Sequence, residues 1–313
     1  MIHTVCLNPA IDQTVCLDHL APGEVHRASA VWRDPGGKAV NVASVLADWG
    51  LPVTVHGLLG AENEASFEEL FARKGIADAM VRMPGATRTN IKILETGGRT
   101  TDLNLPGFAA DSAAAGAVLA GLDAVEDLVV VSGSQPDGLP PGATADLVAA
   151  LAARGARVVL DVSGAPLAAA LAAERLPHAI KPNRHELETY TGRKLQGREV
   201  LRVARGLQER GIALVVVSLG TDGALFVSAE GAVQARPLAL ATGSTVGAGD
   251  AMVAGITAGL AEGLGLADLA RQATAFAAGK LRNPGPHLPP VAEVRALAGQ
   301  VELRPVAEEI TGG

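Results

Sequence analysis

Residues 244–250 combine small side chains with one carboxylate at the start of an expected helix. Small residues let the backbone approach a ligand closely, and the first N–H groups of a helix, which have no partner within it, can bind an anion. We expect Gly247, Ala248 and Gly249 to provide those N–H groups. Asp250, in the first turn, is placed to accept the proton of an attacking hydroxyl. The pattern is equally typical of a glycine-rich turn whose aspartate only caps the helix.

A second glycine segment opens an expected helix at residues 35–43. Gly36 and Gly37 precede Lys38 and Asn41, which should lie one turn apart on the same helix face. An ammonium and an amide in this arrangement can bind a phosphate and sugar hydroxyls. The same pattern also fits an ordinary Gly-Gly turn followed by a solvated lysine.

A carboxylate, Asp12, follows the first expected strand. Ligands of open α/β sheets bind at the carboxyl ends of strands, so Asp12 is suited to accept hydrogen bonds from neighbouring hydroxyls. The Asn8-Pro9 step just before it also initiates turns readily, which leaves a purely structural role open.

Two later segments could serve a nucleotide. Asn183 and Glu186 have the spacing of a capping box at a helix start, and the functional alternative is that they organise Mg²⁺, its waters and nucleotide phosphates. Residues 218–223 follow an apolar strand and predict a turn over which a nucleotide could lie. Its candidate binding residues are Ser218, Gly220, Thr221 and Gly223.

The elements that must position these segments alternate along the chain. Strands are expected at residues 4–7, 53–59, 127–132, 156–162, 179–182 and 213–218, with an edge hairpin at 224–227 and 232–237. Helices are expected at residues 38–49, 66–74, 143–153, 165–173, 184–191, 199–210, 248–263 and 266–281. This alternation predicts one α/β domain over residues 1–313, with a parallel sheet covered on both faces.

Two regions, about 12–34 and 87–105, break that alternation with short β-like runs around turn signals. Such runs are typical of hairpins, and the two regions could together form a small separate sheet.

The composition restricts the possible partners. The net charge is −7 and aromatic residues make up 3% of the 313 residues, which argues against nucleic acid and anionic membranes as ligands. Cys6 and Cys16 have no metal-type spacing and are expected to be small apolar residues. The N-terminus lacks the basic region of a signal peptide and no apolar run is long enough to cross a bilayer, so we expect a cytoplasmic protein.

The order of these five segments resembles that of the PfkB-type carbohydrate kinases, which have the ribokinase-like fold, and the resemblance covers nearly the whole chain. Within this family, the resemblance is strongest to bacterial 1-phosphofructokinases and next strongest to tagatose-6-phosphate kinases. The supporting segments are residues 87–92, 101–104, 131–134 and 180–184. The resemblance implies a three-layer α/β/α sandwich with a mainly parallel central sheet and a small β-sheet lid, which often serves as a homodimer interface.

The resemblance also implies an activity: ATP- and Mg²⁺-dependent phosphorylation of a ketohexose phosphate, with fructose 1-phosphate as the first choice of substrate. Tagatose-6-phosphate kinase and 6-phosphofructokinase remain alternatives within the family. A free-sugar or nucleoside kinase would not need Lys38 and Arg88 to face a substrate phosphate. A non-catalytic sugar-phosphate sensor would not need Asp250, and a dinucleotide oxidoreductase would carry Gly-x-Gly-x-x-Gly after the first strand, which this chain lacks.

Roles carry over from the family position by position. Asp250 would be the catalytic base, with the amides of residues 247–249 around the transferring phosphoryl group. The implied sugar-binding residues are Asp12, Gly36, Gly37 and Asn41. The implied ligands of the substrate phosphate are Lys38 and Arg88, with Arg27 and Lys92 as further candidates. The implied Mg·ATP residues are Asn183, Glu186 (on the metal through water), Ser218, Gly220, Thr221 and Gly223. The Pro-rich residues 282–287 depart from the family pattern, so the adenine contacts stay unassigned.

Overall fold

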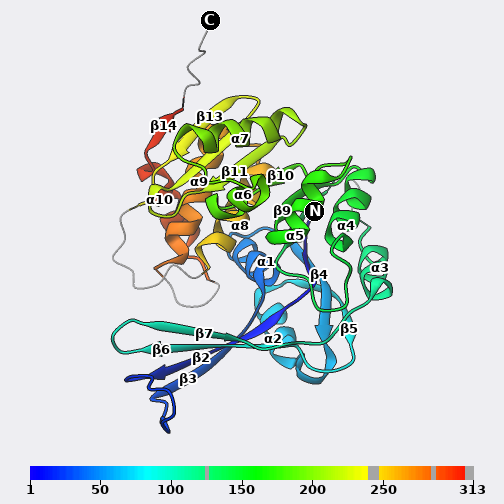
Figure 1. The fold of residues 1–313 in the computed structure, drawn as a ribbon, viewed down its shortest axis with the longest axis vertical. Helices are drawn as coiled ribbons and strands as arrows, with labels where there is room; N and C mark the ends of the chain where they lie inside the picture. The colour runs from blue at the N-terminus through cyan, green and yellow to red at the C-terminus, as the bar shows by residue number, and fades with distance from the viewer. Residues whose placement is uncertain (124–126, 239–246, 283–286, 307–313) are drawn as a thin grey trace, which may run out of the picture.

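A ten-stranded sheet forms the centre of the computed structural model, which describes residues 1–123, 127–238, 247–282 and 287–306 (Figure 1). Its strands are β1 (Ile2–Cys6), β4 (Val53–Gly60), β5 (Ala77–Met83), β8 (Leu128–Ser132), β9 (Arg157–Asp161), β10 (Ala179–Ile180), β11 (Leu214–Ser218), β12 (Ala224–Ser228), β13 (Gly231–Ala235) and β14 (Leu303–Pro305). They follow the order β14-β13-β12-β11-β10-β9-β8-β1-β4-β5. Neighbouring strands from β11 to β5 are parallel, and β12, β13 and β14 extend the other edge in antiparallel fashion.

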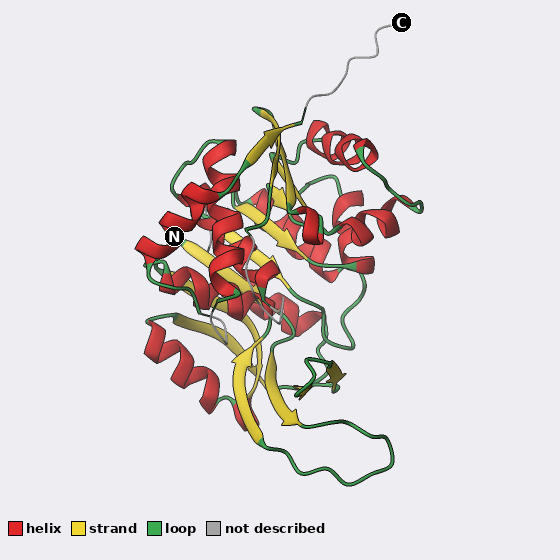
Figure 2. Ribbon diagram, turned by 90° about the vertical axis from the view of Figure 1, so that its left-hand side faces the viewer, coloured by secondary structure: helices red, strands yellow, loops and turns green. Residues whose placement is uncertain are grey.

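Helices cover both faces of this sheet (Figure 2). One face carries α1 (Lys38–Asp48), α2 (Ala65–Lys74), α8 (Ala248–Ala261), α9 (Leu266–Lys280) and α10 (Val291–Gln300). The other carries α3 (Ser112–Ala120), α4 (Ala143–Ala153), α5 (Gly164–Ala172), α6 (Arg184–Thr191) and α7 (Arg198–Glu209). A hydrophobic core lies on each face of the sheet, and successive side chains of a strand point to the two cores in turn. Val130 packs in the core beside α1 and α8, while Val129 and Val131 pack in the core on the opposite face. The predicted three-layer sandwich is confirmed.

Over the described ranges, no helix is both long and apolar enough to span a bilayer.

A small separate sheet consists of β2 (Ala10–Leu17), β3 (Ala30–Gly36), β6 (Thr89–Glu95) and β7 (Thr100–Asn104), in the order β3-β2-β6-β7. Its central pair, β2 and β6, is parallel, and the two outer pairs are antiparallel. It projects from one end of the main body (Figure 1). The small sheet that the resemblance implied is therefore present, and we call it the lid sheet.

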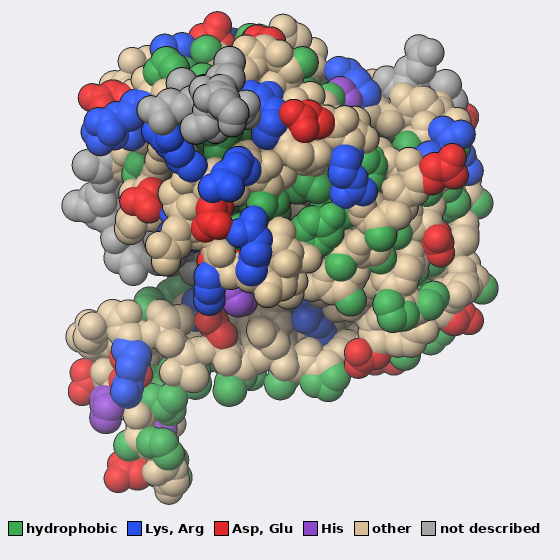
Figure 3. Space-filling view, turned by 45° about the horizontal axis from the view of Figure 1, so that its top comes forward, with side chains coloured by type: hydrophobic (Ala, Val, Ile, Leu, Met, Phe, Trp, Pro, Cys, Tyr) green, Lys and Arg blue, Asp and Glu red, His purple; other side chains and the backbone are tan. Residues whose placement is uncertain are grey.

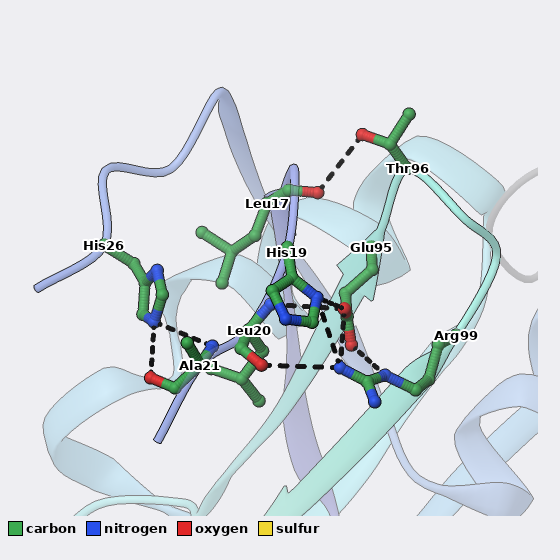
Figure 4. Close-up of polar contacts among 8 residues, drawn as sticks. All are labelled: Leu17, His19, Leu20, Ala21, His26, Glu95, Thr96 and Arg99. Carbon is green, nitrogen blue, oxygen red and sulfur yellow. Dashed lines mark hydrogen bonds and ion pairs between the residues drawn. The ribbon is translucent and has the colours of Figure 1, made fainter. Parts of the chain in front are cut away.

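A polar cluster ties together the far ends of the lid hairpins (Figure 4). The carboxylate of Glu95 accepts hydrogen bonds from Arg99 Nη2 at 2.8 Å and from the backbone N–H of Leu20 at 3.2 Å, and it lies 2.9 Å from Nδ1 of His19. The hydrogen bond from Arg99 is the main reason why the pKa of Glu95 falls to about 2. The N–H of Thr96 also donates to the end of β2. These contacts hold both hairpins as one unit.

Candidate active site

The catalytic candidate Asp250 lies in the first turn of α8, which begins after Gly247. Its side chain is hydrogen-bonded to α1, because Nδ2 of Asn41 donates to Oδ2 at 2.9 Å. Asp250 is only 9% exposed, and burial raises the pKa of its carboxyl to about 6, with the nearby Asp161 acting in the same direction. A carboxyl with this pKa is mostly ionised at neutral pH yet basic enough to accept a proton.

Beside this carboxyl, Gly36 leaves space between two polar side chains. A methyl group built at Gly36 would lie 3.0 Å from Oδ2 of Asp12 and 3.3 Å from Oδ1 of Asn41. Nδ2 of Asn90, on β6, donates to the other oxygen of Asp12 at 3.0 Å. Asp12, Asn41 and Asp250 thus surround one region in which a hydroxylated ligand could bind. Asn90 was not among the site residues predicted from the sequence.

Gly37 sets the start of α1, which carries Lys38 and Asn41. Its φ is +107°, and an added Cβ would lie 2.9 Å from Cα of Pro9 and 3.0 Å from Sγ of Cys6. Only glycine fits this close approach without strain. The thiol of Cys6 is buried, which raises its pKa to about 11, so it stays neutral as the sequence suggested.

A charge cluster lies at the carboxyl ends of β8, β9 and β10, with Asp161 and Lys181 buried and Lys38 half-exposed. Nζ of Lys38 lies 3.3 Å from Oδ2 of Asp161, and Nζ of Lys181 lies 3.0 Å from Oδ1. Burial lowers the pKa of Lys38, but the surrounding carboxylates, Asp161 first, raise it overall. The pKa of Asp161 is lowered by the two ammonium groups, which outweigh burial. Asp161 was missed, although its position at a strand end is the same signal that selected Asp12.

Arg88 lines a cavity of about 400 Å³ together with Asn8, Ser134 and residues 104–108. Its Nε donates to the carbonyl of Pro9 at 3.3 Å. Nδ2 of Asn8 donates to Oγ of Ser134 at 3.1 Å, which joins the loops that follow β1 and β8. In the space-filling view the surface is hollowed where the lid sheet meets the main body (Figure 3).

The two cations expected at the substrate phosphate therefore have different surroundings. Lys38 pairs with Asp161, whereas Arg88 lies beside Asn8 and Pro9 in the cavity. Of the further candidates, Arg27 is exposed in the loop between β2 and β3, and Lys92 pairs with Asp102 at 3.5 Å.

Asn183 and Glu186 form the capping box of α6. The N–H of Glu186 donates to Oδ1 of Asn183 at 2.8 Å, and the N–H of Asn183 donates to Oε2 of Glu186 at 2.7 Å. The capping box predicted from the spacing of Asn183 and Glu186 is confirmed. The charge of Glu186 also contributes to the raised pKa of Lys38, so its carboxylate lies close to the charge cluster.

The turn after β11 lies beside this cap, because Ser218 forms a parallel bridge with Asn183. Gly220 and Thr221 belong to a short 3₁₀ turn, Gly220–Asp222. Gly223 has φ +87°, and an added Cβ would lie 2.0 Å from the carbonyl oxygen of Ala235, so packing alone requires glycine there. The structure thus brings the two predicted nucleotide segments together. Residues 244–246 and 283–286, which belong to two segments singled out in the sequence, lie outside the described residues.

Comparison with known proteins agrees with this arrangement. The model of the "pfkB family carbohydrate kinase" matches residues 5–292. The 1-phosphofructokinase of Xanthomonas campestris pv. campestris is 52% identical over 90% of this chain and 91% of the relative, and that of Rhodobacter capsulatus is 48% identical over 97% of both. Phosphofructokinase-2 from Escherichia coli, solved in complex with potassium, superposes with a TM-score of 0.89 at 29% identity, covering 96% of this chain and 98% of that one. The chain therefore belongs to the pfkB family of carbohydrate kinases, with a ribokinase-like fold and ATP as phosphoryl donor.

Proposed function

We propose that the protein transfers the γ-phosphoryl group of ATP to fructose 1-phosphate and forms fructose 1,6-bisphosphate. The observation that carries this proposal is the position of Asp250: a buried carboxyl with a raised pKa at a helix N-terminus, next to Asp12 and Asn41. The relatives named 1-phosphofructokinase support the choice of sugar, because they are 52% and 48% identical over most of their length.

The geometry supports a direct transfer. Asp12 and Asn41 would orient the sugar so that its 6-hydroxyl faces Asp250. The hydroxyl proton passes to Asp250 while a bond forms between that oxygen and the γ-phosphorus. The bond from the γ-phosphorus to the bridging oxygen breaks, and ADP leaves with the electron pair. The amides of residues 247–249 would face the transferred group at the start of α8.

Asn183, Glu186 and the turn at 218–223 would serve Mg·ATP. Across the part of the chain that the structure describes, no group of three His, Cys, Asp or Glu side chains could hold a metal. Mg²⁺ commonly binds through one or two carboxylates together with substrate phosphates, and it keeps several waters. Oε2 of Glu186 accepts the hydrogen bond of the capping box. The other carboxylate oxygen would accept a hydrogen bond from a metal-bound water. The ion, when bound, neutralises charge on the phosphate oxygens.

For the phosphate already on the sugar, we propose Arg88 as the main ligand. Its guanidinium lines the cavity together with the hydroxyl of Ser134, a neutral donor able to complete a phosphate site, whereas Nδ2 of Asn8 already donates to Ser134 and to the carbonyl of Gln135. Lys38 would lie toward the transferred group, since its charge partners are Asp161, Asp250 and Glu186.

We place this reaction in the cytoplasm, where charged substrates such as ATP and sugar phosphates are retained. The net charge of −7 makes nucleic acid an unsuitable partner.

We also propose that the lid sheet pairs with that of a second copy to form a homodimer. One face of the lid sheet exposes Val31, at 52%, and Leu103, at 47%, while the opposite face exposes Trp32, at 43%. Large apolar side chains exposed on one face of a sheet are typical of an interface. Phosphofructokinase-2 from Escherichia coli has a tetrameric inhibited form, so a relative of this chain associates through copies of itself.

Introducing charge at this surface should dissociate the dimer. We expect Val31→Glu combined with Leu103→Glu, which lie on the same face, to halve the mass seen by light scattering, because two charges would be buried without partners. Ala229→Glu, at the exposed turn between β12 and β13, should leave the mass unchanged. A wild-type chain that runs as a monomer at micromolar concentration would contradict the proposal.

The substrate assignment is tested by measuring ADP release with fructose 1-phosphate, fructose 6-phosphate, tagatose 6-phosphate, fructose and ribose. We expect the highest kcat/KM with fructose 1-phosphate. A higher value with either other sugar phosphate would reassign the substrate within the family. Preference for fructose or ribose would overturn the role given to Arg88.

A further inference from the structure

The side chain of Lys280 reaches the start of α8 from the end of α9. The two helices pack in antiparallel fashion, with Gly255 against Ala273 and Gly259 against Leu269. Methyl groups built at these two glycines would lie 2.7 Å from Cα of Ala273 and 3.0 Å from Cγ of Leu269. This register brings Lys280, the last residue of α9, to the first turn of α8.

Lys280 lies along the turn that opens α8. A methyl group built at Gly247 would lie 2.9 Å from Cε and 3.6 Å from Nζ of Lys280. Gly247 has φ +78°, so both its conformation and its contact with this side chain favour glycine. The ammonium group therefore lies next to the amides that we place around the transferred phosphoryl group.

An ammonium group in this position calls for an anion nearby. The first N–H groups of α8 form the positive end of the helix dipole, which repels a cation. Lys280 is half-buried, and burial lowers the pKa of its ammonium group, while the charge of Asp250 acts to raise it. Asp250 supplies one anion within the chain, and a phosphoryl group bound at the start of α8 would supply another.

Lys280 also balances the charges around the base. Lys38, which is 44% exposed, and the buried Lys181 supply two positive charges. Three carboxylates act on the pKa of Lys38, and they are those of Asp161, Asp250 and Glu186. Three negative and two positive charges would leave one net negative charge where ATP must bring its phosphates. The charge of Lys280 offsets it and so favours the approach of an anion.

A lysine in the last turn of a helix can also act on that helix alone, through the negative end of its dipole. Lys74 is the last residue of α2 and shows this simpler case. Its Nζ donates to the carboxylate of Asp48 and to the carbonyl of Ser44, both on α1 and outside the site. Lys280 differs because it lies against the turn that precedes the base.

We propose that Lys280 is a catalytic residue whose ammonium group contacts the phosphoryl group during transfer, together with the amides at the start of α8. Negative charge spreads over the equatorial oxygens of the group in transit, and a cation already held there stabilises it. The bonds made and broken are those of the transfer described above, and Lys280 stays protonated throughout. The inference deepens the proposed kinase reaction and rests on it.

The main test compares kcat with KM. Lys280→Met keeps much of the length of the side chain but removes its charge. It should lower kcat by a factor of about 10², while KM for ATP and for fructose 1-phosphate should each change by less than about threefold, because the contact strengthens as charge develops in the transition state.

Chemical rescue gives a readout that a purely structural role would not move. In Lys280→Ala, added methylammonium chloride can bind in the vacated space and restore the charge, so it should raise kcat severalfold. Tetramethylammonium chloride at the same concentration has the same charge but no N–H group, and it should not raise kcat. Tm of the variant should be the same in the two salts.

The matched control is Lys74→Met, which removes a lysine from the last position of another helix. It should lower Tm and leave kcat unchanged. Near-normal kcat for Lys280→Met would overturn the inference, as would a loss of kcat in Lys280→Ala that methylammonium does not restore. If instead the wild type releases no ADP with any sugar phosphate, the proposed function itself fails.

Discussion

Replacing Asp250 by Asn should lower kcat by a factor on the order of 10² or more, because the amide cannot accept the proton of the attacking hydroxyl. The hydrogen bond to Asn41 and the packing of α8 can survive this isosteric change, so Tm and ATP binding should stay close to the wild type. The measurement is steady-state turnover with fructose 1-phosphate, together with a thermal melt and ATP titration. The matched control is Asp268→Asn, which changes an exposed carboxylate on α9 and should leave kcat unchanged.

The pH dependence of the wild type should report the same group. The base acts only when ionised, and burial raises the pKa of Asp250 to about 6, so kcat should be nearly constant above pH 7 and fall as the pH drops through about 6. Near-normal turnover of the Asp250→Asn variant would remove Asp250 from the mechanism.

Replacing Arg88 by Ala should raise KM for the sugar phosphate by roughly one to two orders of magnitude, because charge-assisted hydrogen bonds are each worth about 1.5–3 kcal/mol. KM for ATP should move little, since Arg88 lines the cavity beside Asn8 and Ser134 rather than the turn at 218–223. Arg88→Lys should recover only part of the loss, because lysine cannot bind two phosphate oxygens in a planar fork.

The control for this change is Arg33→Ala, an exposed arginine on β3 that donates to Gln13. It should leave both KM values unchanged. Arg88 also donates to the carbonyl of Pro9, so Tm of each variant should be measured alongside. Equal weakening of ATP and sugar phosphate in Arg88→Ala would show that Arg88 supports the fold of the site instead of binding the phosphate.

Much of the main sheet could be predicted because its strands and helices carry their own periodic apolar patterns. The edge strand β5 (Ala77–Met83) was missed, since only Met80 is buried and its stability comes from backbone pairing with β4, which has no local sequence signal. Helix α10 (Val291–Gln300) was missed for a related reason: it buries only Val294 and Leu297.

The site residues that could be predicted are those whose function is indicated by a short sequence segment around them. The glycine segments place Asn41 and Asp250 at two helix starts, and the structure joins them by a hydrogen bond. Asp161 and Lys181 are twenty residues apart in the sequence and meet because β9 and β10 are adjacent parallel strands, so neither residue was given a role. At Asn183 and Glu186 the cap and the proposed nucleotide role use the same spacing, which sequence alone cannot separate.

The most direct test of the central claim is ³¹P NMR of wild-type protein mixed with fructose 1-phosphate, ATP and Mg²⁺. We predict that one new phosphomonoester signal, that of the 6-phosphate of fructose 1,6-bisphosphate, grows in step with ADP while the 1-phosphate signal persists as part of the product. Release of inorganic phosphate without a sugar bisphosphate, or an unchanged spectrum beside a rapid reaction of unphosphorylated fructose, would contradict it.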